Sequence, residues 1–376
     1  MSNKQKLNAE KGTRRIALKK LPKPCKIGFK YHLGDTAGCG YIRCIFPSLL
    51  LNNLVSKDLH IDAFFTNQYT PMPQSYMQTT FAIFQRSATP EQFKMIQHFK
   101  QMRAQTKLNT SIIYEIDDNL FDIPEWNFAR DFYVKNKESA EKILGIVDGI
   151  TVSTDFLKKE YYKYNKNIVV TPNHLPMFLW GEAEFRPQEN KKPRILYAGS
   201  MNHFSIKPGE NHGDMEQELI KYIINTVDKY EWHFVGGAPQ RVLEVARGTG
   251  KIIYHEWQNI MSLPLYLRNI KADISLAPLE NNRFNMSKSN IKALEGTALG
   301  VPMICSNVGP YKGIPGTVET TTDMINRIEE LAGNIDKRQE QWSVQYEYLK
   351  DILYWETNNN LMKYVDSHLR LVKMCL

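Results

Sequence analysis

The sequence predicts an α/β fold made of two doubly wound parallel-sheet domains that face each other, followed by a C-terminal helical clasp. Three observations support this. The length of 376 residues exceeds one ordinary domain of about 100–200 residues. Short apolar runs alternate with helical patterns of about 10–15 residues, which indicates βαβ units. The series of runs restarts at Arg194 after the weakly patterned stretch 175–193, which indicates a second domain.

The predicted strands are short runs rich in β-branched and aromatic residues. Six lie in the first half, at Ile27–Tyr31, Ile61–Phe65, Phe81–Phe84, Ile112–Ile116, Ile150–Ser153 and Ile168–Thr171. Five lie in the second half, at Arg194–Ala198, Trp232–Val235, Ile252–Tyr254, Ile274–Ala277 and Pro302–Cys305. Because ligands bind beyond the carboxyl ends of such strands, we expect functional residues just after them.

These patterns divide the chain into five parts. We predict a basic flexible segment at 1–25, a first domain at 26–175 that binds the acceptor, a linker at 176–192 and a second domain at 193–337. The last part, 338–376, is predicted to be helical and to pack back across the domains. We interpret its many aromatic residues as core packing or as the clasp, not as a ligand site.

The composition excludes several classes of protein. Hydrophobic residues make up 42% and charged residues 23%, which is typical of a globular chain and not of a disordered or fibrous one. No run approaches the roughly 18 apolar residues of a membrane-spanning helix, and the N-terminus lacks the apolar core of a signal peptide. The five cysteines form no Cys-x-x-Cys pair, which argues for a reducing compartment and against structural zinc. We therefore expect a cytoplasmic protein with no metal site.

The positive charge is concentrated in the first 26 residues. They contain nine bases and one acid, whereas the other 350 residues have no net charge. Such a segment can hold a protein on a polyanion through counterion release. A solvated tail without a partner is an equally good interpretation. Membrane phosphate is less favoured, because the segment shows little amphipathic apolar face.

A glycine-rich loop follows the first predicted strand. Gly34, Gly38 and Gly40 would allow close backbone approach to a ligand, and the helix start after them offers free N–H groups to an anion. Arg43, one turn inside that helix, favours anion contact. The spacing matches neither the dinucleotide fingerprint nor a P-loop, so a tight turn explains the loop equally well.

Two adjacent acids, Asp117 and Asp118, follow the fourth predicted strand directly. At a carboxyl strand end, either could act as a general base or orient an acceptor hydroxyl. A divalent metal is a weaker interpretation, because no second acidic cluster lies nearby in sequence. A helix N-cap with a turn is the structural alternative.

The first strand of the second domain runs into Gly199 and Ser200, a turn that suits a phosphate or sugar near backbone amides. His203, Lys207 and His212 follow within the stretch that ends at Asp214 and could supply charge. Isolated histidines are, however, more often structural.

The segment 284–302 carries the strongest pattern. Ser287 and Ser289 are suitable caps for a helix that ends before Gly-Val-Pro. Lys288, Lys292 and Glu295 stand at i, i+4 and i+7, on one face of that helix. Two ammonium groups and a helix N-terminus suit a diphosphate, and a carboxylate one turn further can accept two ribose hydroxyls. A solvated charged face would leave the small residues and Gly-Val-Pro unexplained.

This segment resembles the nucleotide-sugar site of glycosyltransferases with the GT-B fold, in the large retaining group that includes bacterial and phage enzymes. It matches the pattern Phe-Asn-x-x-Lys-Ser-x-x-Lys-x-Leu-Glu-x-x-Ala-Leu-Gly-x-Pro. The turn Pro172-Asn173-His174 is similar to the family's Pro-Asn-Gly before the linker, and the Gly34–Gly40 loop matches its first loop in placement. The resemblance covers roughly residues 26–335 and implies two Rossmann-like domains.

The resemblance implies roles for the matching residues. Lys288 and Lys292 would bind the diphosphate and assist its departure, and Glu295 would bind the ribose. Gly38 and Gly40 would abut the transferred sugar or its phosphate. We assign Gly199, Ser200, Ser287 and Ser289 to the same donor site, and Asp117 and Asp118 to catalysis.

The sequence departs from the family pattern at three places. Asp117 falls where related phage enzymes have a His-Asp pair, but the His position is Ile116. Ser287 stands where many members have a sugar-contacting Glu. The usual Arg/Lys pair after the first strand of the second domain is not evident. The donor sugar and the stereochemical outcome therefore stay open.

We expect a UDP-sugar as donor, with no other cofactor, and a hydroxyl acceptor. The cationic head and the phage-like sequence favour 5-hydroxymethylcytosine in phage DNA, modified by glucosyl or arabinosyl transfer in the host cytoplasm. A polysaccharide, lipid or protein acceptor is an alternative. A nucleotide-sugar epimerase and a binding protein are two further alternatives. The oligomeric state is left open.

Overall fold

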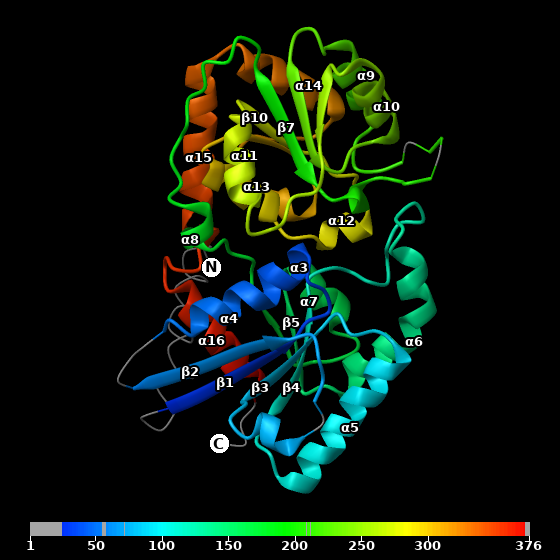
Figure 1. Ribbon diagram of the computed structural model, residues 1–376, viewed down its shortest axis with the longest axis vertical. Helices are drawn as coiled ribbons and strands as arrows, with labels where there is room; N and C mark the ends of the chain where they lie inside the picture. The colour runs from blue at the N-terminus through cyan, green and yellow to red at the C-terminus, as the bar shows by residue number, and fades with distance from the viewer. Residues whose placement is uncertain (1–24, 55–57, 71, 208, 211, 373–376) are drawn as a thin grey trace, which may run out of the picture. The chain divides into compact units, whose positions relative to one another are not determined.

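In the computed structural model, the described residues are 25–54, 58–70, 72–207, 209–210 and 212–372, and they form two six-stranded parallel sheets (Figure 1). Helices surround both sheets, so the predicted α/β class with two parallel-sheet domains is confirmed. The basic N-terminal segment lies outside the described residues, up to residue 24.

The first sheet has the strand order β2-β1-β3-β4-β5-β6, and each neighbouring pair is parallel. Its strands are β1 Cys25–His32, β2 Leu59–Thr66, β3 Phe81–Gln85, β4 Ser111–Ile116, β5 Gly149–Val152 and β6 Ile168–Val170. The order reverses between β1 and β3, so these two strands flank the topological switch point where open α/β sheets bind ligands.

The second sheet has the order β12-β11-β10-β7-β8-β9, again with parallel pairs throughout. Its strands are β7 Arg194–Gly199, β8 Glu231–Gly236, β9 Ile252–His255, β10 Ile274–Ala277, β11 Met303–Ser306 and β12 Thr317–Val318. Counted from its own first strand, this is the 3-2-1-4-5-6 order of a dinucleotide-binding domain, with the switch point between β7 and β10.

Helical segments connect the strands in both halves of the chain. Those up to residue 180 are α3 Gly38–Gly40, the π-helical η1 Tyr41–Ile45, α4 Phe46–Leu51, η2 Pro73–Tyr76, α5 Pro90–Thr106, α6 Arg130–Ile146, α7 Asp155–Tyr161 and α8 Met177–Trp180. The later ones are η3 Met201–His203, α9 Gln217–Asn225, α10 Gln240–Thr249, α11 Leu263–Ile270, α12 Arg283–Ser287, α13 Ile291–Leu299, η4 Gly309–Tyr311, α14 Thr321–Ala332, α15 Ile335–Leu353 and α16 Asn360–Leu371.

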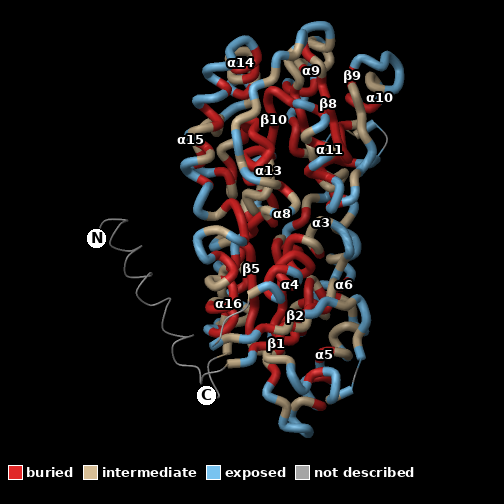
Figure 2. The backbone as a smooth tube through the Cα atoms, turned by 60° about the vertical axis from the view of Figure 1, so that its left-hand side comes forward, coloured by how far each residue is buried: buried red, intermediate tan, exposed pale blue. Residues whose placement is uncertain are grey.

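All eleven predicted runs overlap an observed strand. Only β12 has no predicted counterpart, because two residues are too few to form an apolar pattern. The central strands are buried almost continuously, as parallel strands covered on both faces should be. Figure 2 shows this burial in red along β5 and β10, and all residues of both strands are buried.

The chain divides into two compact units, and each unit contains separate stretches of sequence. Among the described residues, the first contains those from 25 to 118, 135–173 and 355–372, and the second contains 119–134 and 174–354. The sequence analysis placed 119–134 in the first domain and treated 176–192 as a linker, whereas both stretches group with the second unit. The two C-terminal helices belong to different units, α15 to the second and α16 to the first.

Each unit has its own apolar core. In the first, residues of β1, β2 and β3 pack with α4 and with α16, whose Tyr364, Val365 and Leu369 are buried. Trp355, one of the aromatic residues near the C-terminus, also packs in this core, whereas Tyr348 is exposed. In the second, β7, β8 and β10 pack against α9, α10 and α14, with Trp232 and Phe234 fully buried. The two cores make each sheet a rigid base for the loops at its carboxyl edge.

Candidate functional site

The carboxyl end of β7 holds the ammonium group of Lys292. Lys292 Nζ donates to the carbonyl of Ala198, and it lies 5.6 Å from the centroid of the Tyr197 ring. A Cβ atom added to Gly199 would lie 3.0 Å from Lys292 Nζ and 2.7 Å from Tyr197 Oη. A side chain at position 199 would therefore shift the Lys292 ammonium group or the Tyr197 hydroxyl.

Lys292 interacts electrostatically with both Lys288 and Glu295. Burial lowers the pKa of Lys292, with Glu295 opposing that shift and Lys288 adding to it. Burial raises the pKa of Glu295, and Lys292 opposes that shift. Lys288 Nζ lies 4.6 Å from the ring centroid of Phe284, and no ion pair of Lys288 is found in the described part of the chain. The three predicted donor-site residues are thus brought together in the second unit.

The local backbone differs from the prediction. The helix α13 begins at Ile291, and Lys288 lies in an extended break with φ −60° and ψ 162° after the short helix α12. The prediction that Lys288, Lys292 and Glu295 share one face of a single helix is therefore wrong. α13 does end as expected, since Gly300 has the left-handed φ of 77°.

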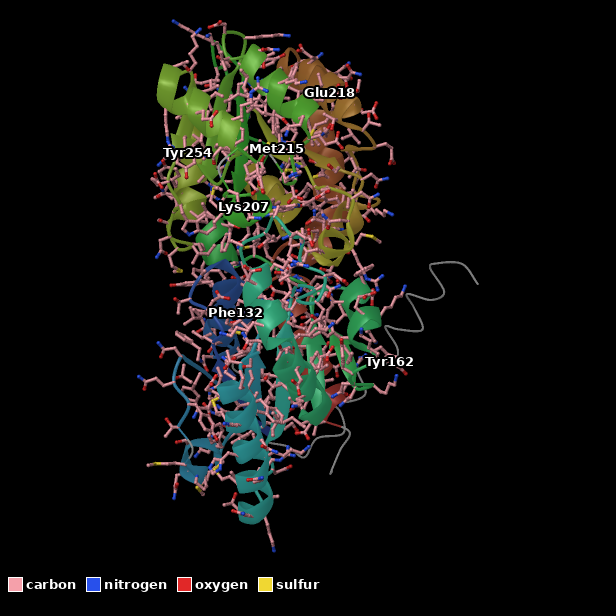
Figure 3. All side chains as sticks on the ribbon, turned by 90° about the vertical axis from the view of Figure 1, so that its right-hand side faces the viewer. Phe132, Tyr162, Lys207, Met215, Glu218 and Tyr254 are labelled. Atoms are coloured by element: carbon pink, nitrogen blue, oxygen red, sulfur yellow. The ribbon has the colours of Figure 1, made fainter. Side chains whose placement is uncertain are left out.

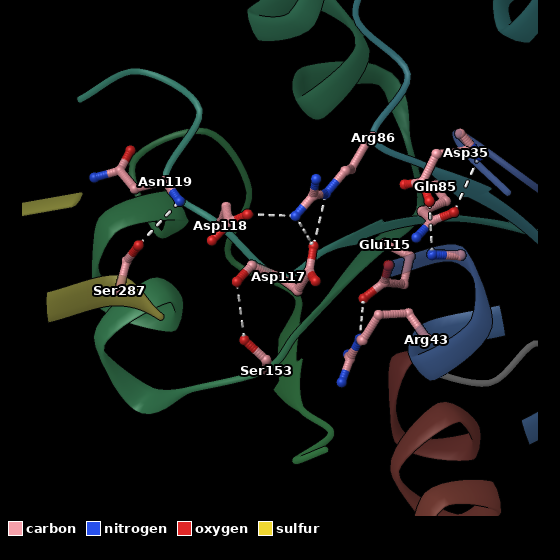
Figure 4. A network of polar contacts seen from close by, with 12 residues as sticks. Asp35, Arg43, Gln85, Arg86, Glu115, Asp117, Asp118, Asn119, Ser153 and Ser287 are labelled. Carbon is pink, nitrogen blue, oxygen red and sulfur yellow. Dashed lines mark hydrogen bonds and ion pairs between the residues drawn. The ribbon is translucent and has the colours of Figure 1, made fainter. Parts of the chain in front are cut away.

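Hydrogen bonds in α12 explain the break. Asn282 caps α12 by accepting from the Asn285 amide at 2.8 Å. The Ser287 hydroxyl donates to the Phe284 carbonyl at 2.6 Å and accepts from the Asn119 amide at 3.1 Å (Figure 4). Buried Ser287 therefore does not cap α13, as the sequence had suggested. Ser289 precedes α13, whose N-cap position is Asn290.

A buried His-Asp pair, which the sequence analysis did not identify, lies in the same unit. His203 Nδ1 donates to Asp214 Oδ2 over 2.6 Å. Asp214 Oδ1 accepts from the Glu280 amide at 3.2 Å and from the side chain of Asn285. Burial lowers the pKa of His203 to about 4, and the charge of Lys288 adds to this effect. At neutral pH the imidazole is therefore uncharged, and Asp214 fixes its tautomer.

A hairpin after β7 creates this pair. The Asp214 amide donates to the His203 carbonyl at 2.9 Å, and Phe204 forms an antiparallel bridge with Gly213. A Cβ added to Gly213 would lie 2.5 Å from the His203 carbonyl oxygen, so the hairpin requires a glycine at this position. The sequence feature that could have indicated the His-Asp pair is therefore His-x₁₀-Asp with a glycine directly before the Asp.

Lys207 and His212, which the sequence analysis also suggested as sources of charge, are not part of the His203–Asp214 pair. Lys207, labelled in Figure 3, lies in the hairpin and pairs with Glu210 at 3.7 Å. His212 is exposed.

The loops after β7 and β8 pack backbone against backbone. A Cβ at Gly237 would lie 2.6 Å from the Ser200 carbonyl oxygen, and one at Gly236 would lie 2.7 Å from the Gly199 carbonyl oxygen. Ser200 also accepts from the His203 amide at 3.3 Å. The predicted pair Gly199 and Ser200 therefore forms part of a tight turn, in which the Ser200 carbonyl is already hydrogen-bonded within the protein.

In the first unit, Asp117 and Asp118 share one arginine (Figure 4). Arg86 Nε donates to Asp117 Oδ1 at 2.7 Å, and its Nη2 pairs with Asp118 Oδ2. Arg86 has a positive φ of 48°, an uncommon value for a residue other than glycine. The sequence analysis missed Arg86, because it lies after β3, away from the two acids in sequence.

The backbone around the two acids is also fixed. Ser153 Oγ donates to the Asp117 carbonyl at 3.3 Å, and Tyr161 Oη donates to the Asp118 carbonyl at 3.1 Å. Since Arg86 engages both carboxylates from one side, each keeps further acceptor positions for a hydroxyl group.

The ligand atoms of Cys39, Asp117 and Asp118 lie within 4.8 Å of one another, a spacing that a metal ion could bridge. The guanidinium of Arg86 already supplies positive charge to both carboxylates. Burial raises the pKa of the Cys39 thiol well above its usual range. In this structure the two carboxylates form an ion-pair cluster with Arg86.

The glycine-rich loop is organised by Asp35. Its Oδ1 accepts from the Ala37 amide at 2.8 Å and from the Gly40 amide at 3.0 Å. A Cβ at Gly40 would lie 2.0 Å from the Asp35 carbonyl oxygen, whereas one at Gly38 would meet open space. The turn itself thus requires Gly40, and only Gly38 retains the open approach predicted for both.

Arg43 does not serve as the anion contact that the sequence suggested. Its Nε pairs with Glu115 at 2.6 Å, and its Nη1 donates to the carbonyl of Thr171 at 2.6 Å and to Asn173 Oδ1 at 2.7 Å. Both charged side chains are 2% exposed, so this is a buried structural pair. Burial raises the pKa of Glu115 to about 7, although Arg43 acts in the opposite direction.

Among the described residues, no helix combines the length and apolar character needed to cross a membrane.

Comparisons with known proteins relate the chain to others through its fold. No protein-family model matches it, and no curated protein matches its sequence. The N-terminal domain of trehalose-6-phosphate phosphatase from Candida albicans matches with a TM-score of 0.52 and 8% identity over 94% of this chain and 98% of that chain.

Two weaker matches have TM-scores of 0.44. The wall teichoic acid polymerase TagF H548A is 12% identical over 97% of this chain and 94% of that chain. A chain of the GtfA/B complex is 13% identical over 77% of this chain, and the match spans only 57% of that chain. At such identities, the likeness to the Candida domain concerns the fold alone.

Proposed function

We propose that the chain is a glycosyltransferase that takes a sugar from a nucleoside-diphosphate sugar, with a UDP-sugar as the expected donor. The observation that supports this most is the position of Lys292, held beside Gly199 at the end of β7 with Lys288 close enough to lower its pKa. Two adjacent ammonium groups repel each other unless an anion lies between them. β7 also flanks the switch point of its sheet, where nucleotides bind in folds of this topology.

The neighbouring groups suit the rest of such a donor. Glu295 lies one turn after Lys292 in α13, where its carboxylate can accept two ribose hydroxyls. Neutral His203, fixed by Asp214, adds no positive charge beside Lys288 and can exchange a hydrogen bond with a phosphate or sugar oxygen. The leaving diphosphate gains negative charge during transfer, and preorganised cations stabilise that charge.

The donor site is tested with a thermal-shift panel of UDP, GDP, ADP and dTDP sugars, followed by turnover measurements. We expect one nucleotide sugar to stabilise the protein, because a ligand that binds only the folded state raises its stability. Lys292→Met should lower turnover by about 10²–10³-fold, the usual effect of losing one oxyanion donor. Lys221→Met in α9 is the matched control, since Lys221 is exposed. Equal activity of both variants would remove the proposed site.

For the acceptor, we propose 5-hydroxymethylcytosine in DNA. The support is the charge of the first 26 residues, nine bases and one acid, which suits a polyanion. Deleting residues 1–24 should weaken DNA binding and flatten its salt dependence while leaving donor binding unchanged. A wild-type chain without affinity for DNA at low salt would exclude this acceptor and leave a polysaccharide, lipid or protein.

Asp117 is proposed to orient the acceptor hydroxyl. Asp117→Asn keeps the size of the side chain and removes its charge, so transfer should fall further than donor binding. An equal loss of transfer activity and of donor binding would indicate that Asp117 has only a structural role. Product formation that needs no acceptor would instead indicate an epimerase, and binding without turnover would indicate a binding protein. Retention of the anomeric configuration, the outcome in the resembling group, is checked on the product by NMR.

A further inference from the structure

A cavity of about 290 Å³ lies in the segment 119–134, which follows β4 closely in sequence. The residues that line the cavity all come from 120–134, and this stretch groups with the second unit. The volume is at the lower end of the roughly 300–1,000 Å³ that is typical of small-molecule sites. The cavity can therefore hold one ring-sized group, but not a whole nucleotide.

Much of the lining is apolar. Leu120 and Ile123 are buried, Phe121 and Pro124 are half-buried, and Val134, in the first part of α6, is 60% exposed. A ligand in the cavity thus meets carbon atoms over part of its surface. Binding is favourable only if the ligand has apolar surface of its own to remove from water.

The polar part of the lining offers both acceptors and donors. Arg130 Nη2 lies 3.3 Å from Glu125 Oε1. Asp122 Oδ2 accepts from Asn119 Nδ2 at 2.7 Å and pairs with Arg283 Nε at 3.0 Å. The side chains of Glu125 and Asp122 are 88% and 40% exposed, so a ligand can reach their carboxylate oxygens. Because each acid is paired with a base, the lining has no excess positive charge for an anion.

Hydrogen bonds join the segment 119–134 to residues beside the donor cluster. The Asn119 amide donates to Ser287 Oγ at 3.1 Å, and Ser287 directly precedes Lys288 (Figure 4). Asn127 Nδ2 donates at 2.9 Å to the carbonyl of Asn202, in the turn after β7. A ligand in the cavity would therefore lie next to the elements that carry the predicted donor site.

We propose that the cavity binds the ring of a neutral sugar. A sugar ring has C–H groups that pack on apolar side chains such as Phe121 and Ile123. Its hydroxyl groups donate to carboxylates and accept from a guanidinium. An apolar wall with paired charges beside it suits both properties, whereas a phosphate is bound best by cations that lack a carboxylate partner.

The sugar ring belongs either to the nucleotide-sugar donor or to a saccharide acceptor. Only the choice between these two sources rests on the proposed function, because a neutral sugar can bind in the cavity without any nucleotide.

Sugar binding is tested by saturation-transfer NMR with the methyl glycosides of glucose, galactose and arabinose, in the absence of nucleotide. We expect at least one glycoside to bind saturably. Val134→Trp should narrow the cavity and abolish this binding. Glu125→Gln keeps the size of the side chain and should weaken the affinity about tenfold, the usual effect of losing a hydrogen bond to a charged group.

Val344→Trp in α15 and Glu244→Gln in α10 are the matched controls, since both residues are exposed and lie outside the cavity. Both variants should bind the glycoside like the wild-type chain. Circular dichroism checks that each variant is folded, and Glu125→Gln decides the outcome if Val134→Trp is not.

Three results would overturn the proposal. The first is that none of the glycosides binds, and the second is that Val134→Trp and Glu125→Gln both bind like the wild-type chain. The third concerns cyclohexanol, an apolar ring with a single hydroxyl group. If cyclohexanol binds as tightly as the glycoside and Glu125→Gln has no effect on either, the cavity is not specific for a sugar.

A nucleotide sugar selected in the thermal-shift panel then identifies the source of the ring. If the ring belongs to the donor, Val134→Trp should weaken binding of the nucleotide sugar but not of its free nucleoside diphosphate. If the ring belongs to an acceptor, the glycoside should stay bound in the presence of the nucleotide sugar. A chain that binds glycosides in the cavity but no nucleotide sugar would contradict the proposed function and support the sugar site.

Discussion

Arg43 and Arg86 show how the same residue type serves two purposes near one strand. Arg43 pairs with Glu115 within β4, where both side chains are 2% exposed. Arg86 pairs with Asp117 and Asp118 just beyond β4, and its side chain is 16% exposed. The first pair is part of the interior, whereas the second is partly exposed. Sequence alone does not separate the two roles, since Glu115 is 72 residues from Arg43.

The buried pair leads to a prediction about stability. Glu115→Ala leaves the guanidinium of Arg43 buried without a counter-charge, so it should destabilise the protein by about 3–5 kcal/mol. The free energy of unfolding in urea measures this. Replacing both partners by apolar residues, as Arg43→Met with Glu115→Leu, should cost less than the single change.

The exposed pair of Lys142 and Glu138 in α6 supplies the control. Glu138→Ala should change the free energy of unfolding little, because exposed ion pairs contribute little. A loss of stability in Glu138→Ala as large as in Glu115→Ala would contradict the account of Arg43.

At the scale of elements, the two ends of α13 were unequally predictable. Its end follows from local chemistry, because Gly300 adopts a left-handed conformation that glycine favours. Its start depends on α12, a five-residue helix that turns Ser287 back onto Phe284 and towards Asn119. No pattern in 284–302 reveals a partner 168 residues away. The donor roles of Lys288, Lys292 and Glu295 therefore stay a prediction, whereas their predicted shared helix face was wrong.

Gly300 gives a prediction at this scale. A Cβ on Gly300 would lie 1.9 Å from the Glu184 carbonyl oxygen, in addition to the strain of a positive φ. Gly250, which ends α10, has a similar φ of 64° but open space around it. Gly250→Ala should therefore cost only the left-handed penalty of about 1–2 kcal/mol, and Gly300→Ala distinctly more.

Chemical denaturation of both variants measures the difference. Because α13 also carries Lys292, Gly300→Ala should further weaken nucleotide-sugar binding, which Gly250→Ala should leave intact. Equal stability losses in the two variants would contradict this prediction, because they would show that the backbone moves away from the Glu184 carbonyl at no cost.

At the scale of the whole molecule, three buried histidines make stability depend on pH. Burial lowers the pKa of His32 to about 3 and the pKa values of His203 and His368 to about 4. An unfolded histidine titrates near 6.5. Between pH 6.5 and about 4, the unfolded chain therefore binds protons that the folded chain does not. Stability should be fully present above pH 6.5 and should fall as the pH decreases through this range.

Replacing one of these histidines should reduce that dependence. In His203→Gln, the slope of unfolding free energy against pH between 4 and 6.5 should fall by up to one proton, or about 1.4 kcal/mol per pH unit. Urea titrations at several pH values provide the slope. The exposed His212 is the control, and His212→Gln should leave the slope unchanged. A slope unaffected by His203→Gln would contradict the buried neutral state of that imidazole.

The two sheets were predictable because each strand carries its own apolar, β-branched run, from Ile27–Tyr31 to Pro302–Cys305. The division of the chain into two units was less predictable from the sequence. Residues 119–134 follow β4 directly and look like its continuation, yet they group with the second unit through bonds such as that from Asn127 Nδ2 to the Asn202 carbonyl at 2.9 Å. Long-range hydrogen bonds of single polar side chains leave no periodic trace in a sequence.

The interleaving of the two units determines how the gene can be divided. A fragment that starts at residue 174 would lack 119–134, and with it the Asp122 carboxylate that pairs with Arg283 at 3.0 Å. A fragment that stops at residue 173 would lack α16, whose Leu369 and Leu371 fill the first core. Neither unit is one continuous stretch of the polypeptide, so expressing either unit alone requires joining separate parts of the coding sequence.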